Sequence, residues 1–340
     1  MMGDVKRAGD EPEVEGDEAV AEREAARGGR AGDGPLRFRV LGVEDGMKLR
    51  QLLARRLKVA PTAAAELVRA GGVYVGAVRM CVPTLRVAEG ERVTVYRAAA
   101  AAKPVDLEAL RVVHRDDNCV IVDKPHGVPA AATRVSSRGT VAHALVQRLT
   151  HEKVARPYVG LVHALPTAAA GLAVFTIRGQ ATESFFKAFA ELAMVRRYLV
   201  RIAGVLPATM ACSAGVVAVP GGGWRLARGT DREGVATTTE VVRLAALDEE
   251  TLAEVTLTGG GTAGGEAVRL HLGALGLTLV GDAEHGGAGP GAEAPQVLCL
   301  LASHVSFVHP RTGVVVAVEA ERPGWANAGA SNLPTRGTSA

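Results

Sequence analysis

The sequence predicts an α+β protein in which a small basic α/β unit precedes a larger domain with a mixed, mostly antiparallel β-sheet. Two observations lead to this class. Residues 47–70 carry two short helical patterns followed by a small hairpin pattern. From residue 108 to 323, short β-rich runs alternate with turns, which is typical of strands joined by loops. The chain of 340 residues is long enough for two folded units and tails.

Three segments outside these units have the composition of tails or linkers. Residues 1–35 are predicted to be a disordered acidic tail, because the first 34 residues hold ten acidic and five basic side chains and almost no large apolar ones. Residues 99–107, AAAAKPVDL, are predicted to be an Ala-rich linker. Residues 324–340 are predicted to be a second disordered tail. The two domains predicted between them span 36–98 and 108–323.

The location of the protein is predicted only broadly. No apolar run approaches the roughly 18 residues of a membrane span, so we expect no membrane partner. The four cysteines are far apart in strand-like contexts and are predicted to be buried thiols. The acidic tail differs from an Arg- and Ser-rich transit peptide. We therefore expect an intracellular protein, of the cytoplasm or of an organelle such as the mitochondrion.

The first unit begins with two helices. In the stretch 47–58, MKLRQLLARRLK, four leucines fall on one arc of a helix and basic side chains cluster on the opposite side. Pro61 then opens a second helix, which Gly71 and Gly72 end. The run VYV, a Gly-Ala turn, and the pattern TLRV–AEGE–RVTVY predict strands after the helices.

The positive charge of the chain is concentrated in this unit. Residues 36–97 hold twelve Lys and Arg against five Asp and Glu, although the whole chain has a net charge of only +3. Such a patch predicts binding to a polyanion, with basic side chains that contact phosphate and position the ligand. The predicted RNA-binding residues here are Lys48, Arg50, Arg55, Lys58 and Arg69.

The segments KLRQLLARRL, TAAAELVRAGGVYVGAVRM and TLRVAEGERVTVY resemble the RNA-binding module named after ribosomal small-subunit protein four, here the S-four module. The resemblance covers about sixty residues and implies that the two helices bind structured RNA. The turn AGGVYVGA lacks the usual Asn-Gly of that family, and the helix start lacks its usual Ser-Arg.

The larger domain resembles the RluA-type RNA pseudouridine synthases. The segments that carry the resemblance are KPHGVP after CVIVD, GLVHALPTAAAGLAVF, FKAFAELAMVRRYLVRIAG, EAVRLHLGALGLTLVGDAEHGG and LLASHVSFVHPRTG, in the order of that family. From their composition, we expect strands at RYLVRIAG, EVVRLAAL, LAEVTLTG, AVRLHLGAL and the last of these segments, and helical or loop structure at THEKVARP and ATESFFKAFAEL.

The loop that carries catalysis in that family is altered here. The family pattern His-Arg-Leu-Asp-x-x-Thr-Ser-Gly falls on His163 to Gly171, which reads HALPTAAAG. By this resemblance, Pro166 occupies the position of the nucleophilic aspartate and Ala164 that of the arginine that fills the gap left by the flipped base. Breaking the bond between base and sugar requires a carboxylate, and base extrusion costs a few kcal/mol. The resemblance therefore predicts that both steps are impaired.

Other family positions are retained in part. Tyr198 matches the tyrosine that stacks on the target base, although a core aromatic explains it equally well. Arg269 matches the arginine that pairs with the missing aspartate, so we expect it to lack an internal anion and to bind an RNA phosphate. The arginine of a Thr-Gly-Arg triplet falls on Gly264. Histidine spacing predicts no metal site, the glycine-rich loop lacks a P-loop lysine, and no cofactor is expected.

Three functions follow from these observations. The first is a catalytically inactive synthase relative that binds RNA, most simply rRNA, together with ribosomal or assembly proteins in ribosome biogenesis. The second is an active synthase in which Asp123 or Asp282 has replaced the lost carboxylate. The third is a structural ribonucleoprotein subunit that holds partners through the acidic tail. We expect the first.

Overall fold

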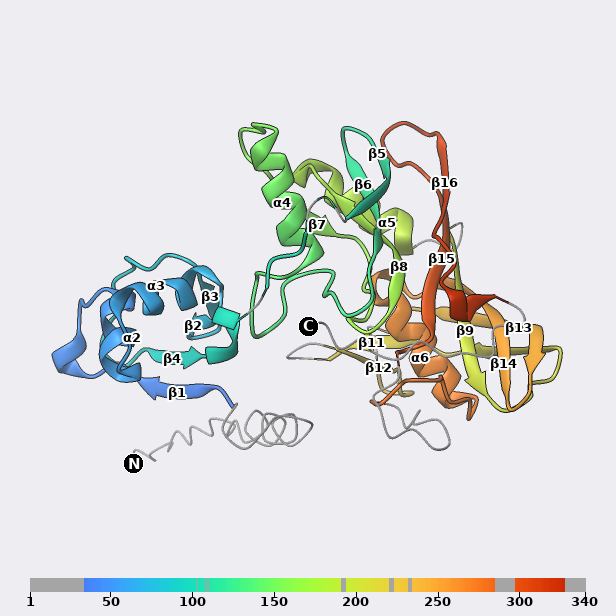
Figure 1. Ribbon diagram of the computed structural model, residues 1–340, viewed down its shortest axis with the longest axis horizontal. Helices are drawn as coiled ribbons and strands as arrows, with labels where there is room; N and C mark the ends of the chain where they lie inside the picture. The colour runs from blue at the N-terminus through green and yellow to red at the C-terminus, as the bar shows by residue number, and fades with distance from the viewer. Residues whose placement is uncertain are drawn as a thin grey trace, which may run out of the picture. The chain divides into compact units, whose positions relative to one another are not determined.

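The computed structural model describes residues 34–101, 103–106, 108, 110–190, 194–219, 223–231, 234–284 and 297–327 (Figure 1). They divide into two compact units. The first holds the described residues before Lys103 together with 134–136, and the second holds the remainder. The tails predicted for 1–35 and 324–340 lie mostly outside the described residues. No helix in these ranges is long and apolar enough to cross a membrane.

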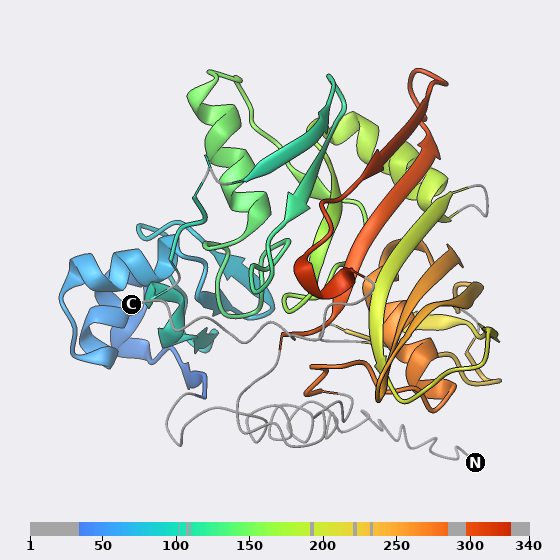
Figure 2. The ribbon, with the colours of Figure 1, turned by 45° about the vertical axis from the view of Figure 1, so that its right-hand side comes forward.

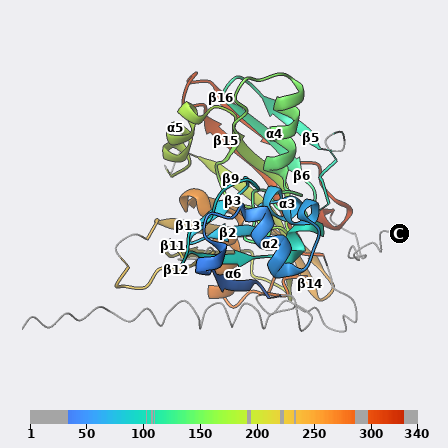
Figure 3. The same cartoon turned by 90° about the vertical axis from the view of Figure 1, so that its left-hand side faces the viewer.

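The first unit packs two helices with a four-stranded antiparallel sheet (Figure 3). In sheet order the strands are β1 (Leu36–Arg39), β4 (Arg92–Val95), β2 (Val73–Val75) and β3 (Val78–Met80). Helix α2 (Leu49–Leu57) buries Leu49, Leu52 and Leu53 completely, so the predicted leucine face is confirmed. Helix α3 (Pro61–Arg69) starts at the predicted proline. Two 3-10 turns, η1 (Gly42–Glu44) and η2 (Arg97–Ala101), complete the unit.

Details of the first unit differ from the prediction. The expected strand at TLRV is reduced to one bridge between Lys48 and Arg86, and β2 pairs with β3 across the Gly-Ala turn instead. Ala99, predicted to begin the linker, is buried in the core of this unit. The segment 134–136 was predicted to belong to the larger domain, yet Ser136 Oγ donates to Ala70 O at 3.0 Å within the first unit.

The second unit is built on a ten-stranded, mostly antiparallel sheet, as Figure 2 shows. Its main order is β10-β13-β14-β9-β15-β8-β6-β5, with β16 paired to β15 and β7 to β8, and the β15–β8 pair is parallel. The bounds are β5 Arg111–Arg115, β6 Cys119–Lys124, β7 Gly160–Leu161, β8 Ala170–Thr176, β9 Val195–Ala203, β10 Thr209–Ser213, β13 Thr237–Leu247, β14 Glu250–Gly259, β15 Leu300–Val308 and β16 Val315–Glu319. A separate pair joins β11 (Val216–Ala218) and β12 (Trp224–Leu226). The predicted mixed α+β class is confirmed.

Three helices accompany this sheet: α4 (Val141–His151), α5 (Gly179–Ala190) and α6 (Gly265–Ala274). Helix α5 lies where helical or loop structure was predicted. The sequence analysis missed α4 and wrongly predicted AVRLHLGAL to be a strand. In α6 Arg269 and His271 are buried together with the apolar side chains, so the alternation of polar and apolar residues does not mark a half-exposed strand.

The predicted start of the C-terminal tail is also wrong. Residues Gly324–Ala326 form a 3-10 turn, η4, and Trp325 is buried against Leu199, Leu252 and Leu301. The Trp325 carbonyl accepts a hydrogen bond from Arg201 Nε at 2.9 Å. A single tryptophan therefore fixes a segment whose composition is otherwise typical of a disordered tail.

Candidate functional site

The loop 162–169 is held by the start of α6. It leaves β7 and enters β8, and its middle contacts the 3-10 turn η3 (Gly261–Ala263) and the first residues of α6. Ala164 N donates to Thr262 O at 2.6 Å, and Gly265 N donates to Ala164 O at 3.0 Å. The backbone of Ala164 is thus fixed on both sides, which gives the loop one defined path.

Pro166 is buried in this loop. Its ring lies against the backbone of α6, because a Cβ added to Gly265 would come within 2.9 Å of Pro166 Cδ. Proline has no ionisable group, and residues 164–170 contain none either. Residues 164–170 therefore present neither a carboxylate nucleophile nor an ionisable general base.

Ala164 is half-buried, and the space beside it is closed. Gly264 lies next to it with φ 51° and ψ −126°, and a Cβ there would come within 2.2 Å of Ala164 O. The resemblance places a family arginine at Gly264. In this structure no side chain fits that position without a shift of the backbone around it.

His163, at the beginning of the loop, is fully buried. Its ring stacks on Phe189, with 5.6 Å between the centroids. Burial lowers the pKa of His163 to about 3, and the positive charge of Arg196 adds to this effect. His163 is consequently neutral at physiological pH, and its Nδ1 has no hydrogen-bond partner among the described residues.

Arg196 is the residue that the sequence analysis missed. Its guanidinium is buried on β9 and donates to the carbonyls of Gly259 and Gly261, at 2.8 Å for Gly261. Within the described ranges it has no carboxylate partner, and burial lowers its pKa. The signal was in the pattern RRY, where Arg196 and Tyr198 share one face of a strand.

Tyr198 is also buried, with 1% of its surface exposed. Its hydroxyl has no hydrogen-bond partner in the described part of the chain, and burial raises its pKa although Arg196 opposes this. The ring belongs to the hydrophobic core of the second unit. In this conformation Tyr198 is a core aromatic that is closed off from solvent.

Arg269 corrects a prediction. The sequence analysis expected it to lack an internal anion, but its Nε and Nη2 donate to both carboxylate oxygens of Asp282, at 2.9 and 2.6 Å. Glu266 and Glu284 lie at 3.0 and 2.7 Å. Burial lowers the pKa of Arg269, but these carboxylates outweigh it and hold the pKa above its usual value. Arg269 is therefore neutralised inside the domain, which argues against a role as an RNA ligand.

The two carboxylates proposed as replacements for the nucleophile are both engaged. Asp282 is 3% exposed and bound to Arg269. Asp123 Oδ2 accepts the backbone N–H of Glu321 at 3.1 Å and lies 3.4 Å from Arg111 Nη1. Burial raises the pKa of Asp123, and Glu321 N–H and Arg111 reduce this shift. Neither carboxylate contacts the loop 162–169 through any described hydrogen bond.

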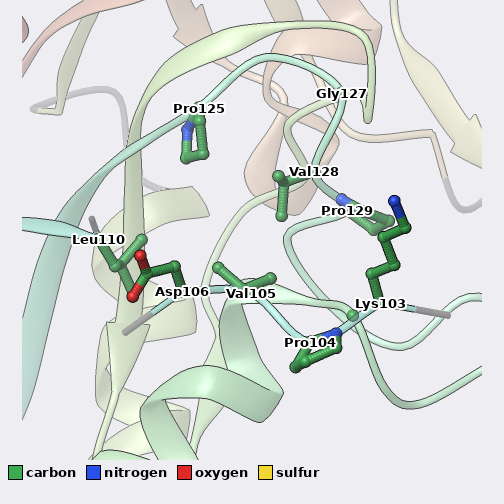
Figure 4. A pocket seen from close by; sticks show the side chains of 10 residues that line it. Lys103, Pro104, Val105, Asp106, Leu110, Pro125, Gly127, Val128 and Pro129 are labelled. Carbon is green, nitrogen blue, oxygen red and sulfur yellow. The ribbon is translucent and has the colours of Figure 1, made fainter. Parts of the chain in front are cut away.

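The buried side chain of Lys124 donates hydrogen bonds to backbone carbonyls of the loop 162–169. Lys124 Nζ lies at 2.5 Å from Ala169 O, 2.8 Å from Val128 O, and 3.2 Å from Thr167 O and Pro125 O. Burial lowers its pKa to about 7. The turn after Lys124 also borders a pocket of about 420 Å³ (Figure 4), lined by Lys103, Pro104, Val105, Asp106, Leu110, Pro125, Gly127, Val128, Pro129 and Gly139.

We expect Lys124 to make stability depend on pH. Its pKa is about 7 in the folded chain and about 10.4 in an unfolded one, so between these values only the unfolded chain binds the proton. The free energy of unfolding should therefore rise from pH 7 to pH 10, and Lys124→Met should flatten this rise. Denaturant unfolding at several pH values measures the free energy of unfolding of wild type and Lys124→Met. The exposed Lys187→Met is the control, and parallel profiles for Lys124→Met and wild type would contradict the prediction.

The predicted RNA-binding residues of the first unit lie along both helices. Lys48 precedes α2 and Lys58 follows it, while Arg50 and Arg55 are on α2. Lys48 and Arg55 are two helical turns apart on one face, and Arg50 points roughly the opposite way. Arg69 ends α3 and pairs with Glu66, with half of each side chain exposed. The five residues therefore do not form one continuous stripe.

Part of the basic charge is used within the unit. Arg56 donates to both carboxylate oxygens of the buried Glu44 at 2.7 Å, and its guanidinium lies over Phe38. The hydrogen bond from Arg56 lowers the pKa of Glu44, although burial opposes it. The count of twelve basic residues thus overstates the charge that is available to a ligand.

Comparison with known proteins finds similarity over much of the chain. Residues 118–261 match the RNA pseudouridylate synthase family. An uncharacterized RNA pseudouridine synthase of Aquifex aeolicus is 26% identical over 310 residues, which cover 85% of this chain and 93% of that protein. A ribosomal large subunit pseudouridine synthase D of Zymomonas mobilis is 26% identical over 232 residues, covering 65% and 71%. An uncharacterized RNA pseudouridine synthase of Mycobacterium bovis is 29% identical, covering 82% and 91%.

Over these ranges the chain is similar to RNA pseudouridine synthases. Among solved structures, human RNA pseudouridylate synthase domain containing 1 is similar, with 19% identity and a TM-score of 0.49 over 65% of this chain and 86% of that one. The matched segment 118–261 includes the loop with Pro166, the strand with Arg196 and Tyr198, and the start of η3.

Proposed function

We propose that this protein is an RNA-binding relative of the pseudouridine synthases that does not isomerise uridine, and that it acts on rRNA as a binding or ribosome-assembly factor. The observation that carries the proposal is Pro166, buried against Gly265 where the resemblance places the nucleophile. Isomerisation requires a carboxylate near the anomeric carbon, either as nucleophile or as base. A proline ring provides neither function.

The surroundings of Pro166 favour a site that has adapted to the loss. Arg196 is held by two backbone carbonyls, and Arg269 is held by Asp282. At Gly264, where the resemblance places a family arginine, an added Cβ would clash with Ala164 O. Neither arginine depends on a carboxylate at position 166.

We predict that the purified full-length protein forms no pseudouridine in rRNA or its transcribed fragments. A tritium-release assay on 5-tritiated uridine in RNA measures this directly. Turnover that disappears in Asp123→Asn, Glu266→Gln or Asp282→Asn would support an active synthase with a displaced carboxylate. Pro166→Asp is expected to remain inactive, since Ala164 and Gly264 leave the arginine positions of the family unfilled.

For RNA binding, we propose the first unit as an S-four-like module. Two helices with basic side chains at Lys48, Arg55 and Lys58 support this assignment. Phosphate contacts release counterions, so the logarithm of the binding constant falls with the logarithm of salt concentration by about 0.9 per neutralised phosphate.

We therefore predict that Arg55→Ala with Lys58→Ala weakens binding to an rRNA fragment and reduces the salt slope by roughly 1 to 2. Both side chains are exposed, so the fold should be retained. Fluorescence anisotropy over a salt series measures affinity and slope. Lys187→Ala, an exposed lysine of the second unit, is the matched control. An unchanged slope in the double variant, or an equal loss in the control, would place RNA binding elsewhere.

A second function, a structural ribonucleoprotein subunit that holds partners through the acidic tail, rests on residues outside the described ranges. RNA cross-linking in cells separates the two: specific rRNA fragments that are lost with Arg55→Ala and Lys58→Ala favour direct binding. Recovery that depends on residues 1–35 instead favours assembly through the tail.

A further inference from the structure

The turn between β5 and β6 holds a cluster of side chains that the proposed function does not use. Asp116 closes this turn, and its Oδ1 accepts the backbone N–H groups of Asn118 at 2.6 Å and Cys119 at 2.9 Å. One carboxylate oxygen is thereby occupied by the turn. The other, Oδ2, is surrounded by side chains that are metal ligands in many proteins.

Asp116 Oδ2 lies close to two other potential metal ligands, His114 and Cys119. His114 Nε2 lies 3.2 Å away, Cys119 Sγ 3.5 Å away, and the donor atoms of His114, Asp116 and Cys119 all lie within 4.8 Å of one another. A tetrahedral zinc ion with bonds of about 2.0–2.3 Å separates neighbouring N, O and S donors by roughly 3.3–3.5 Å. The two separations from Asp116 Oδ2 are close to the edges of such a tetrahedron, and the third pair of donors lies within 4.8 Å.

We propose that His114, Asp116 and Cys119 bind a divalent metal ion of the zinc class, independently of the loop at Pro166. A set of one imidazole, one carboxylate and one thiolate suits Zn²⁺ or Co²⁺, whereas Mg²⁺ and Ca²⁺ require oxygen ligands. The side chains of His114 and Asp116 are 28% and 30% exposed, so the ion can enter from solvent, and a water molecule can complete its coordination.

His309 gives the cluster a second, independent feature. Its ring is buried, and Nδ1 accepts the backbone N–H groups of Arg311 at 3.2 Å and Thr312 at 3.1 Å. The other ring nitrogen, Nε2, lies 3.2 Å from Asp116 Oδ2 without an aligned hydrogen bond in the described structure. His309 thus faces the carboxylate ligand as an outer neighbour and can orient it once the ion draws Oδ2 inward.

Cys119 must lose its proton when the ion binds. Burial raises the pKa of the Cys119 thiol, and the charge of Asp116 adds to this, so without a metal the thiol is protonated and donates to Asp116. Metal binding then releases a proton to solvent. The sequence predicts no metal site, because it has neither an HExxH pattern nor closely spaced cysteines. His114 and Cys119 are instead brought together by the turn.

Cobalt titration of the metal-free, full-length protein tests the site. Chelator-treated protein is expected to bind one Co²⁺ and to show a thiolate-to-cobalt charge-transfer band together with the visible bands of tetrahedral Co²⁺. Addition of Zn²⁺ should displace the cobalt and remove both signals. A wild-type protein that shows no charge-transfer band overturns the proposal at this step.

Variants assign the ligands. Cys119→Ser should remove the charge-transfer band, whereas Cys299→Ser, an equally buried cysteine of the same unit, and the exposed Cys81→Ser should retain it. His114→Gln changes a partly exposed side chain and should weaken cobalt binding without unfolding the protein. His309→Gln should keep one ion per chain with about 10–100-fold lower affinity. A band that persists in Cys119→Ser, or that disappears in Cys81→Ser, overturns the proposal.

Discussion

Replacement of Gly264 by alanine is expected to lower the free energy of unfolding by roughly 3 kcal/mol or more. At φ 51° and ψ −126°, Gly264 has a backbone conformation that only glycine adopts without strain. A Cβ would come within 2.2 Å of Ala164 O and 3.1 Å of His163 Cδ2. The carbonyl cannot move away easily, since it accepts the N–H of Gly265, and Ala164 N is bound to Thr262 O.

Gly273→Ala is the matched control for this prediction. Gly273 lies in the last turn of α6 and is exposed, and a Cβ added there would have no neighbouring atom within 4 Å. Alanine at this position should leave the protein unchanged or stabilise it by up to about 1 kcal/mol. Denaturant unfolding of both variants measures the difference. Equal stability of Gly264→Ala and Gly273→Ala would show that the loop does not depend on the bend at Gly264.

At this site, the sequence predicted which residues occupy the loop but not how they pack. The resemblance assigns Pro166 and Ala164 to two family positions, because His163 and Gly171 match the residues on either side. The packing around these positions could not be predicted. The contact of Pro166 with Gly265 and the bend at Gly264 depend on how two segments about a hundred residues apart pack together.

The same limit explains the errors with the arginines. Sequence alone offered Arg269 as the cation without a partner, and the structure gives it Asp282, thirteen residues further along the chain. Arg196, which looked like one of many strand residues, is instead a buried cation that bonds to backbone carbonyls. The partner of a buried charge depends on tertiary contacts. Helix or strand periodicity in the sequence does not predict these contacts.

Periodicity predicted elements well where one face is buried and the other exposed. The leucines of α2 are an example, since Leu49, Leu52 and Leu53 are buried and Arg55 is exposed. It failed for α6, where Arg269 and His271 are buried beside apolar residues. It also failed for the C-terminal segment, where one buried tryptophan fixes a stretch of small and polar residues.

Replacement of Arg269 by methionine is expected to lower the free energy of unfolding by about 3–5 kcal/mol, because it leaves the buried Asp282 carboxylate without its cation. Asp282 is 3% exposed and receives two hydrogen bonds from the guanidinium. Methionine has a similar length and fills the space, so the loss reflects the removed ion pair with Arg269. Denaturant unfolding at neutral pH measures the effect.

Two comparisons separate the charge from the packing. Arg269→Met with Asp282→Leu removes both charges and should recover much of the stability lost in the single variant. Arg115→Met breaks an equally well aligned pair with Glu152, but these side chains are 38% exposed, so it should cost less than about 1 kcal/mol. If the double variant is no more stable than Arg269→Met, packing explains the loss. If Arg269→Met instead folds normally and loses RNA affinity, the arginine is an RNA ligand after all, and its internal pairing does not prevent it from reaching phosphate.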